Sequence, residues 1–213
     1  NRGVLELMLG RLHHRGPAGK WIHNRKKAAL GCCVLPSEGK QPARTHAQTG
    51  DTAAVIDGHL FCEDDPQLLE GDFLITLYNK FGPSFVERLD GDFAFALATD
   101  SELILARDAV GLRPLFYGHK DGALYFASEM KALLGLCAEV VELPPGHVYT
   151  QRQGLQPFKR LQYSVPEFDS PEEAAHLLSD LLRGAVEMRL KDGNVGGVLL
   201  SGGLDSSIVA YLA

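Results

Sequence analysis

The sequence predicts an α/β protein, in which two stacked sheets with helices outside are followed by the start of a second domain built on a parallel sheet. The first part rests on residues 92–128, where short apolar runs alternate with small residues and are separated by turns. The second part rests on residues 170–213, where a long amphipathic helix precedes an apolar run, a glycine turn and a new helix. That order is typical of parallel α/β domains.

The N-terminal stretch predicts two helices and two strands. Apolar residues recur at helical spacing over residues 3–15 and again over residues 68–81. Short apolar runs over residues 27–35 and 52–56 predict strands. Asp57-Gly58 follows the second run, and this pair predicts a turn.

A hairpin and a helix start are predicted further along the chain. Lys120-Asp121-Gly122 separates the apolar runs 115–117 and 123–127, as the turn of a hairpin would. Ser170, Pro171 and Glu173 combine a capping serine, a proline at the first helical position and a glutamate at the third. This combination predicts a long helix from residue 171.

The apolar run 195–200 predicts a buried strand directly before the glycine turn. We place the boundary between the two regions between about residues 150 and 170, which gives domains 1–160 and 161–213. Neither end of the sequence has the character of a natural terminus, so we expect further residues on both sides.

Composition restricts the classes of partner. A formal net charge of −6 argues against a broad nucleic-acid surface, and no apolar run approaches the ~20 residues of a membrane span. We therefore expect a cytoplasmic protein that acts on small molecules, with a homodimer as a further expectation. The four cysteines show no C-x-x-C pair and no zinc-finger spacing, which predicts reduced thiols: Cys32, Cys33, Cys62 and Cys137.

The stretch from Ser201 to Ser207 predicts a phosphate-binding turn. Two glycines allow a close approach of the backbone to an anion, and the helix that follows points unpaired N–H groups and the positive end of its dipole at it. Asp205 fits a role in orienting the turn or holding Mg²⁺. The Walker pattern and its lysine are absent. The alternative is a glycine turn that merely links two elements. The predicted ATP-binding residues are Leu200, Ser201, Gly202, Gly203, Asp205, Ser206 and Ser207.

Seven motifs upstream of this turn follow one another in a defined order. They are His14-Arg15-Gly16-Pro17, Gly39-Lys40-Gln41-Pro42, residues 89–96, Ala106-Arg107-Asp108, residues 111–117, residues 126–133 and residues 143–147. Together they resemble the class II glutaminase domain of the glutamine-hydrolysing asparagine synthetases. The turn Ser201–Ser207 resembles the phosphate loop of the ATP pyrophosphatases.

The resemblance implies a fold and an activity. It implies an N-terminal αββα sandwich of the Ntn-hydrolase type that releases ammonia from glutamine. It also implies a second domain that adenylates a carboxylate, aspartate in the family, with ATP and Mg²⁺, so that ammonia displaces AMP. Adenylation creates a good leaving group on a carboxylate that is otherwise a poor electrophile.

The chain departs from the family at the positions that bind glutamine. The family begins with a nucleophilic cysteine, whereas position 1 here is Asn1. Val34 stands where the family has an arginine, and Asp57-Gly58 stands where an asparagine amide stabilises an oxyanion. Glu70 is the nearest match to the family's acid. These four residues, Val34, Asp57, Gly58 and Glu70, form the predicted vestigial glutamine site, and we expect weak glutamine hydrolysis.

Two alternatives to an asparagine synthetase-like ligase remain open. The first is a ligase similar to β-lactam synthetase, whose substrate closes on its own amine and which needs no working glutaminase. The second is a non-catalytic regulatory protein that keeps the fold. Within the resemblance, Arg107, Asp108 and Arg113 are expected to organise strands, and Glu129 and Lys131 are expected to pair on the surface.

Overall fold

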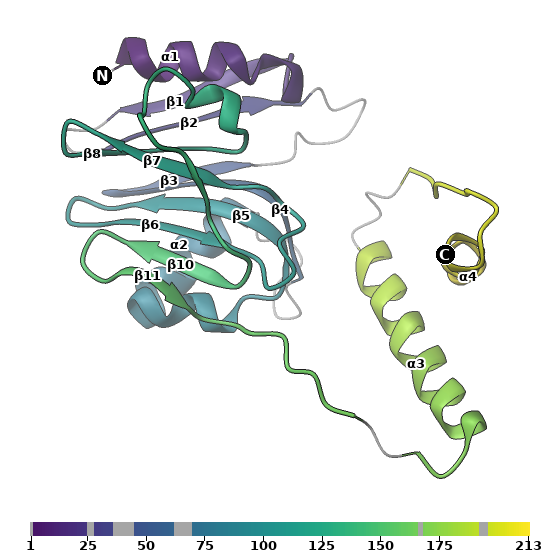
Figure 1. Ribbon diagram of the computed structural model, residues 1–213. Helices are drawn as coiled ribbons and strands as arrows, with labels where there is room; N and C mark the ends of the chain where they lie inside the picture. Colours follow the sequence, from purple (N-terminus) through teal and green to yellow (C-terminus); the bar gives the residue numbers. More distant parts are fainter. Residues whose placement is uncertain (1, 25–27, 36–44, 62–69, 166–167, 192–195) are drawn as a thin grey trace. The chain divides into compact units, whose positions relative to one another are not determined.

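The computed structural model describes residues 2–24, 28–35, 45–61, 70–165, 168–191 and 196–213. The chain divides into two compact units, residues 1–161 and 162–213. The first unit holds the strands and the first two helices, and the second unit holds two further helices (Figure 1).

A six-stranded antiparallel sheet is the centre of the first unit. Its strand order is β11-β10-β6-β5-β4-β3. The strands span β3 (His46–Thr49), β4 (Thr52–Leu60), β5 (Gly91–Ala98), β6 (Leu103–Arg107), β10 (His147–Thr150) and β11 (Gly154–Pro157). The prediction of short strands within residues 92–128 is confirmed by β5 and β6, which are buried along almost their whole length.

Two smaller antiparallel sheets form the second β layer. One contains β1 (Gly19–Asn24) and β2 (Ala29–Val34), and the other contains β8 (Ala123–Ala127), β7 (Phe116–Lys120) and β9 (Val141–Glu142) in that order. The predicted hairpin is confirmed: Asp121 and Gly122, with φ of 50° and 74°, form the turn between β7 and β8. Positive φ at both turn residues matches the twist of the two strands.

Helices cover the outer faces of the two β layers. α2 (Glu70–Phe81) packs on β3 and β4, and α1 (Arg2–Arg11) packs on β2 (Figure 1). One apolar core, around Phe85, Phe93 and Phe95, lies between α2 and the six-stranded sheet. A second core lies between the β layers. The observed order is therefore helix, sheet, sheet, helix, as the sequence predicts.

Asp57 and Gly58 do not form the predicted turn. Both lie inside β4, where Asp57 pairs with Ala94 and Gly58 pairs with Phe93. Gly58 has φ of 122°, and a Cβ there would lie 1.8 Å from the carbonyl oxygen of Asp92. Glycine is needed at this position because two paired strands approach closely there. The Asp57-Gly58 pair is typical of turns, and the prediction of a turn from it was wrong.

The loop after β6 is fixed by Arg107 and Asp108. The Asp108 carboxylate accepts hydrogen bonds from the backbone amides of residues 110–113, at 2.6–3.2 Å. Arg107 donates to the carbonyl oxygens of Gly111, Arg113 and Leu143. Both side chains are buried, which agrees with the expected organising role. Their joint effect is to fix the backbone from which Arg113 projects.

The second unit contains α3 (Pro171–Leu190) and α4 (Leu204–Leu212). The predicted start of α3 is confirmed, since Ser170 Oγ accepts from the Glu173 amide at 3.2 Å and Glu173 Oε2 accepts from the Asp169 amide at 3.0 Å. The predicted strand over residues 195–200 is wrong for residues 196–200, which form no strand. A strand requires a hydrogen-bonded neighbour, and no described segment pairs with this run.

Candidate functional site

A cavity of about 700 Å³ lies between the layers of the first unit. It is lined by residues of α1, β2, β4, β5 and β8. In the described part of the chain, β2 pairs only with β1 in a ladder and β8 pairs only with β7. Two strands that each have one open edge therefore contribute to the wall of the cavity.

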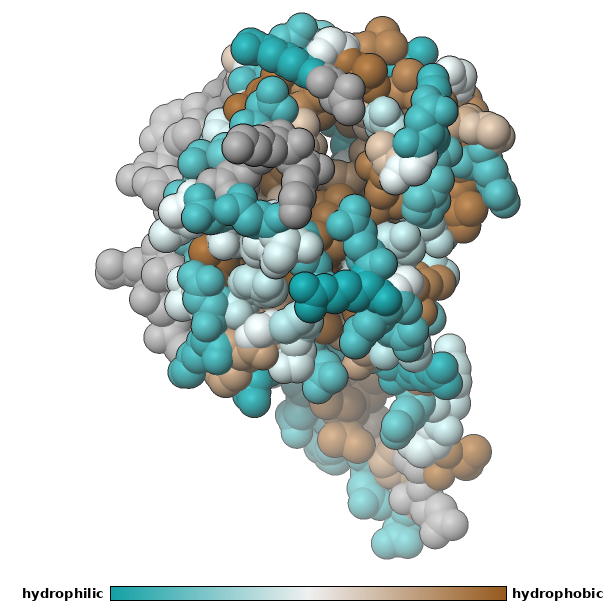
Figure 2. Space-filling view, turned by 90° about the vertical axis from the view of Figure 1, so that its left-hand side faces the viewer, coloured by the Kyte–Doolittle hydropathy of each residue, from teal (hydrophilic) through white to brown (hydrophobic). Residues whose placement is uncertain are grey.

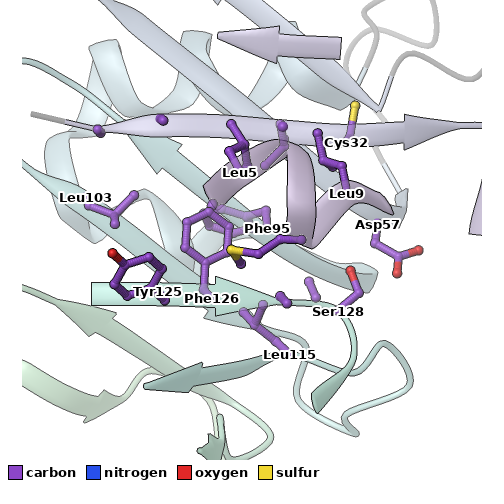
Figure 3. A pocket seen from close by; sticks show the side chains of 18 of the residues that line it. Leu5, Leu9, Cys32, Asp57, Phe95, Leu103, Leu115, Tyr125, Phe126 and Ser128 are labelled. Atoms are coloured by element: carbon purple, nitrogen blue, oxygen red, sulfur yellow. The ribbon is translucent and has the colours of Figure 1, made fainter. Parts of the chain in front are cut away.

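The cavity has apolar side chains along much of its wall and charged ones in two places: one end holds Asp57, and Asp100 and Glu102 from the turn after β5 also line the cavity. Figure 3 shows Leu5 and Leu9 of α1 on one side and Phe95, Leu115 and Phe126 on the other. Asp57 and Ser128 lie at the polar end in the same view. From outside, polar side chains dominate the visible face, with apolar ones showing between them (Figure 2). The site can hold a largely apolar group that carries one polar or charged end.

Arg15 and Arg113 meet the Asp57 carboxylate at the polar end. Arg15 Nη2 donates to Asp57 Oδ2 at 2.6 Å, and Arg113 Nη1 lies 3.9 Å from Asp57 Oδ1. Arg113 also donates to Asp92 Oδ2 from Nη2 at 2.7 Å and from Nε at 3.1 Å. Arg15 extends the set to Glu129, at 3.3 Å. We call these five residues the charged network.

Glu129 gathers three basic groups. Lys131 Nζ lies 3.0 Å from Glu129 Oε2, and His14 Nε2 lies 2.8 Å from Oε1, the oxygen that also accepts from Arg15. Burial alone would raise the pKa of Glu129, but the hydrogen bonds from Lys131, His14 and Arg15 outweigh it and lower that pKa to about 2. Glu129 is therefore a stable anion, and the expected pairing of Glu129 with Lys131 is observed.

The structure does not bring the four predicted glutamine-site residues together. Of the four, Asp57 lines the cavity. Val34 pairs with Gly19 at the end of β2, and the Gly58 backbone packs against Asp92. Glu70 Oε1 lies 3.3 Å from His59 Nδ1, and this hydrogen bond raises the pKa of His59 above its ordinary value. The glutamine site therefore stays a prediction: Asp57 and Gly58 are neighbours on β4 and face opposite sides of the sheet, while Val34 and Glu70 lie on β2 and α2.

Sequence reasoning missed the roles of Arg15, Arg113 and Glu129 at the cavity. Each lies in one of the seven motifs shared with the family, but Arg15 and Glu129 are 114 positions apart. One local signal was present: a carboxylate such as Asp57, at the end of an apolar run, needs a cation nearby. Which basic residue pairs with Asp57 depends on the packing of α1 against the β layers.

The turn before α4 is closed by hydrogen bonds among its own residues. Gly202 has φ of 82°, and Gly203 precedes the first residue of α4. Ser206 Oγ donates to the Gly203 carbonyl oxygen at 3.1 Å and accepts from the Ser201 amide at 3.3 Å, so these two serines close the turn. Ser207 Oγ donates to the same carbonyl oxygen at 2.8 Å. Within the described segments, no protein group accepts from the amides of residues 204–206.

The residues of this turn fit a nucleotide phosphate. The open amides lie at the positive end of a nine-residue helix, and Asp205 lies in its first turn, where a carboxylate could hold Mg²⁺. Leu200 is exposed beside the turn. Within the described ranges, no group of three or more histidine, cysteine or acidic side chains is placed to hold a metal ion.

The helices described here include none that is long and apolar enough to cross a membrane.

Comparisons with known proteins match both parts of the chain. Residues 24–135 match the model of the glutamine amidotransferase domain, and residues 177–213 match the asparagine synthase model. Glutamine-hydrolysing asparagine synthetases from Arabidopsis thaliana and Zea mays are each 35% identical over 95% of this chain, which covers 38% and 37% of those proteins. A probable asparagine synthetase from Dictyostelium discoideum is 33% identical. The chain spans about two-fifths of the length of these relatives.

Solved structures share the fold. Glutamine phosphoribosylpyrophosphate amidotransferase from B. subtilis matches with a TM-score of 0.58 and 17% identity, over 87% of this chain and 55% of that one. An allosteric regulatory enzyme of purine biosynthesis matches with a TM-score of 0.50 and 18% identity, over 86% of this chain and 48% of that one. The fold and the match over residues 24–135 lead to one conclusion: the chain belongs to the glutamine amidotransferase domain family, with relatives among the asparagine synthetases.

Proposed function

We propose that the full-length protein is an ATP-dependent ligase of the asparagine synthetase kind, which adenylates the carboxylate of aspartate or a similar acid and amidates it with ammonia. The observation that carries this proposal is the turn Ser201–Ser207, which leaves the first amides of α4 without a protein acceptor in the described chain. The same residues fall within the asparagine synthase match.

Each group of the turn has a role in this proposal. The amides of residues 204–206 bind phosphate oxygens, because the helix dipole favours an anion at that end. Ser201 and Ser206 fix the shape of the turn through their mutual hydrogen bond of 3.0 Å. Asp205 holds Mg²⁺, whose charge offsets that of the phosphates. When bound, ATP supplies an adenylyl group that turns the acceptor carboxylate into an electrophile.

The charged network makes efficient glutamine hydrolysis unfavourable. A class II glutaminase must stabilise the oxyanion that forms when a thiolate attacks the amide of glutamine. Asp57 instead places a carboxylate at the polar end of the cavity, held by Arg15 at 2.6 Å. We therefore propose that ammonia from solution, or an amine of the substrate itself, is the more effective nitrogen donor.

A second candidate function follows from Asp57. If the amine belongs to the acceptor, the protein is a ligase similar to β-lactam synthetase with an inactive glutaminase domain. The ion pair of Asp57 with Arg15 favours this candidate, since such an enzyme has no need of an oxyanion site.

Exchange of pyrophosphate into ATP tests the proposal on the full-length protein. Radiolabelled pyrophosphate should enter ATP only when an acceptor carboxylate is present, with aspartate assayed beside other acids. Product formation is then compared with ammonia, with glutamine and without either. Exchange that depends on aspartate, with product from ammonia, supports the first candidate. Product without any added nitrogen donor supports the second, and the lack of exchange with every acid contradicts both.

A further inference from the structure

Cys32 and His46 form a thiol–imidazole pair in the wall of the first unit. The Cys32 Sγ atom lies 3.6 Å from His46 Nδ1 and 3.6 Å from Thr45 Oγ1. Cys32 is on β2, and His46 is the first residue of β3, so the pair joins the two β layers. This pair takes no part in the charged network or in the turn before α4.

The His46 ring is held in place by an aromatic neighbour. Trp21 of β1 stacks on it with ring centroids 4.6 Å apart and an interplanar angle of 25°. Trp21 is also the direct strand partner of Cys32. A nucleophile, a base within reach and a third group that orients the base together form the arrangement that activates nucleophiles in enzymes.

The pair borders the cavity. Cys32 and Thr45 both line it, and Figure 3 shows Cys32 on β2 at its edge. The surrounding wall is apolar, with Val55, Ala94 and Ala96 on the facing strands. An uncharged molecule loses little hydration in such a place, whereas an anion loses much.

Burial keeps both members of the pair neutral. It raises the pKa of the Cys32 thiol and lowers the pKa of His46, against a smaller opposing effect of Asp72 on α2. In the tautomer whose Nδ1 carries no hydrogen, a neutral His46 ring has a free lone pair facing the Cys32 sulfur and can accept the thiol proton as the sulfur reacts. A charged imidazolium could not.

We propose that Cys32 is a covalent modification site for small, uncharged carbon electrophiles that enter the cavity, with His46 as the base. In the reaction the Cys32 sulfur forms a bond to the electrophilic carbon. The leaving group departs with the electron pair of the broken bond, and the thiol proton passes to His46 and then to solvent. This proposal does not rest on the ligase activity.

Alkylation of the full-length protein tests the site, with mass spectrometry reporting the rate at each cysteine. Iodoacetamide and iodoacetate are the probes, since they share a leaving group and differ in charge. Cys33 is the matched internal control, because it neighbours Cys32 but its Sγ contacts the Leu9 carbonyl oxygen at 3.5 Å on the α1 side. Cys137 is buried and reports unfolding.

Iodoacetamide should alkylate Cys32 about tenfold faster than Cys33, and it should react with Cys32 about tenfold faster than iodoacetate does. His46→Gln should lower the rate at Cys32 about tenfold and leave Cys33 and Cys137 unchanged. Thr45→Val, which keeps the base, should change the rate at Cys32 less than His46→Gln does. The wild-type rates test the site even if His46→Gln does not fold. Equal rates at Cys32 and Cys33, or no effect of His46→Gln in a folded protein, would overturn the proposal.

Discussion

Arg15 donates from Nη2 to Oδ2 of Asp57 at 2.6 Å, and this contact joins the segment after α1 to the middle of the central sheet. Both side chains are about 30% exposed, at 32% and 28%, so the pair is accessible from the cavity. It places a neutralised carboxylate at the polar end of the cavity. Four predictions follow from this contact and from others described above.

Asp57→Asn should raise glutamine hydrolysis in the full-length protein by about tenfold or more, because an amide can donate to an oxyanion that a carboxylate repels. The measurement is glutamate release at saturating glutamine. Asp121→Asn is the control, since it makes the same chemical change in the β7–β8 turn, at a φ that asparagine tolerates. An unchanged rate in folded Asp57→Asn would show that Asp57 does not limit hydrolysis.

Gly58→Ala should destabilise the first unit by about 3 kcal/mol or more, because its φ and the neighbouring backbone both exclude a side chain. The Cβ would lie 1.8 Å from the Asp92 carbonyl oxygen. Gly122→Ala is the matched control, with φ of 74° and no atom within 4 Å of its Cβ, and should cost about 1 kcal/mol. Urea unfolding measures both. If both variants lost the same free energy of unfolding, the backbone around Gly58 would be able to move and accommodate a Cβ.

Glu129→Gln should lower stability at neutral pH and remove part of its acid dependence. The pKa of Glu129 is about 2 in the folded protein and ordinarily about 4.3 in an unfolded chain, so its contribution is complete above the ordinary value and is lost as pH falls toward 2. Thermal unfolding from pH 7 to pH 2 measures the effect. The difference from wild type should shrink across that range.

Glu6→Gln is the control for this series. Glu6 forms an exposed pair with Arg2 at 2.9 Å on α1, with side chains 51% and 70% exposed. Exposed pairs contribute little to stability, so this variant should follow the wild-type curve at every pH. A constant difference between Glu129→Gln and wild type down to pH 2 would contradict a role for the Glu129 charge.

Asp205→Asn should lower ATP–pyrophosphate exchange by the full-length protein at least tenfold, because an amide is a weaker Mg²⁺ ligand than a carboxylate. Raising the Mg²⁺ concentration should restore part of the loss. Asp180→Asn is the control, since Asp180 is an exposed acid in the middle of α3. Loss of exchange in both variants alike would point to a general effect of charge and not to the turn.

Local signals in the sequence predicted the elements whose geometry is local. The Ser170 cap, the Asp121-Gly122 turn and the spacing of α2 each depend on residues a few positions apart, and all three appear in the structure. The prediction failed where pairing decides conformation. Asp57-Gly58 reads as a turn until β5 is placed beside it, and the apolar run 196–200 reads as a strand although no described neighbour pairs with it.

The sequence by itself determined the layered class of the first unit, because apolar periodicity is a property of short segments. The placement of glycines before α4 predicts a phosphate-binding turn on the same local grounds. Only the tertiary structure decided that Arg15 neutralises Asp57, that Glu129 gathers three basic groups, and that Cys32 meets His46. The physical reason is distance along the chain: Arg15 lies 42 positions from Asp57 and 114 from Glu129, so packing of the layers sets their ion pairs.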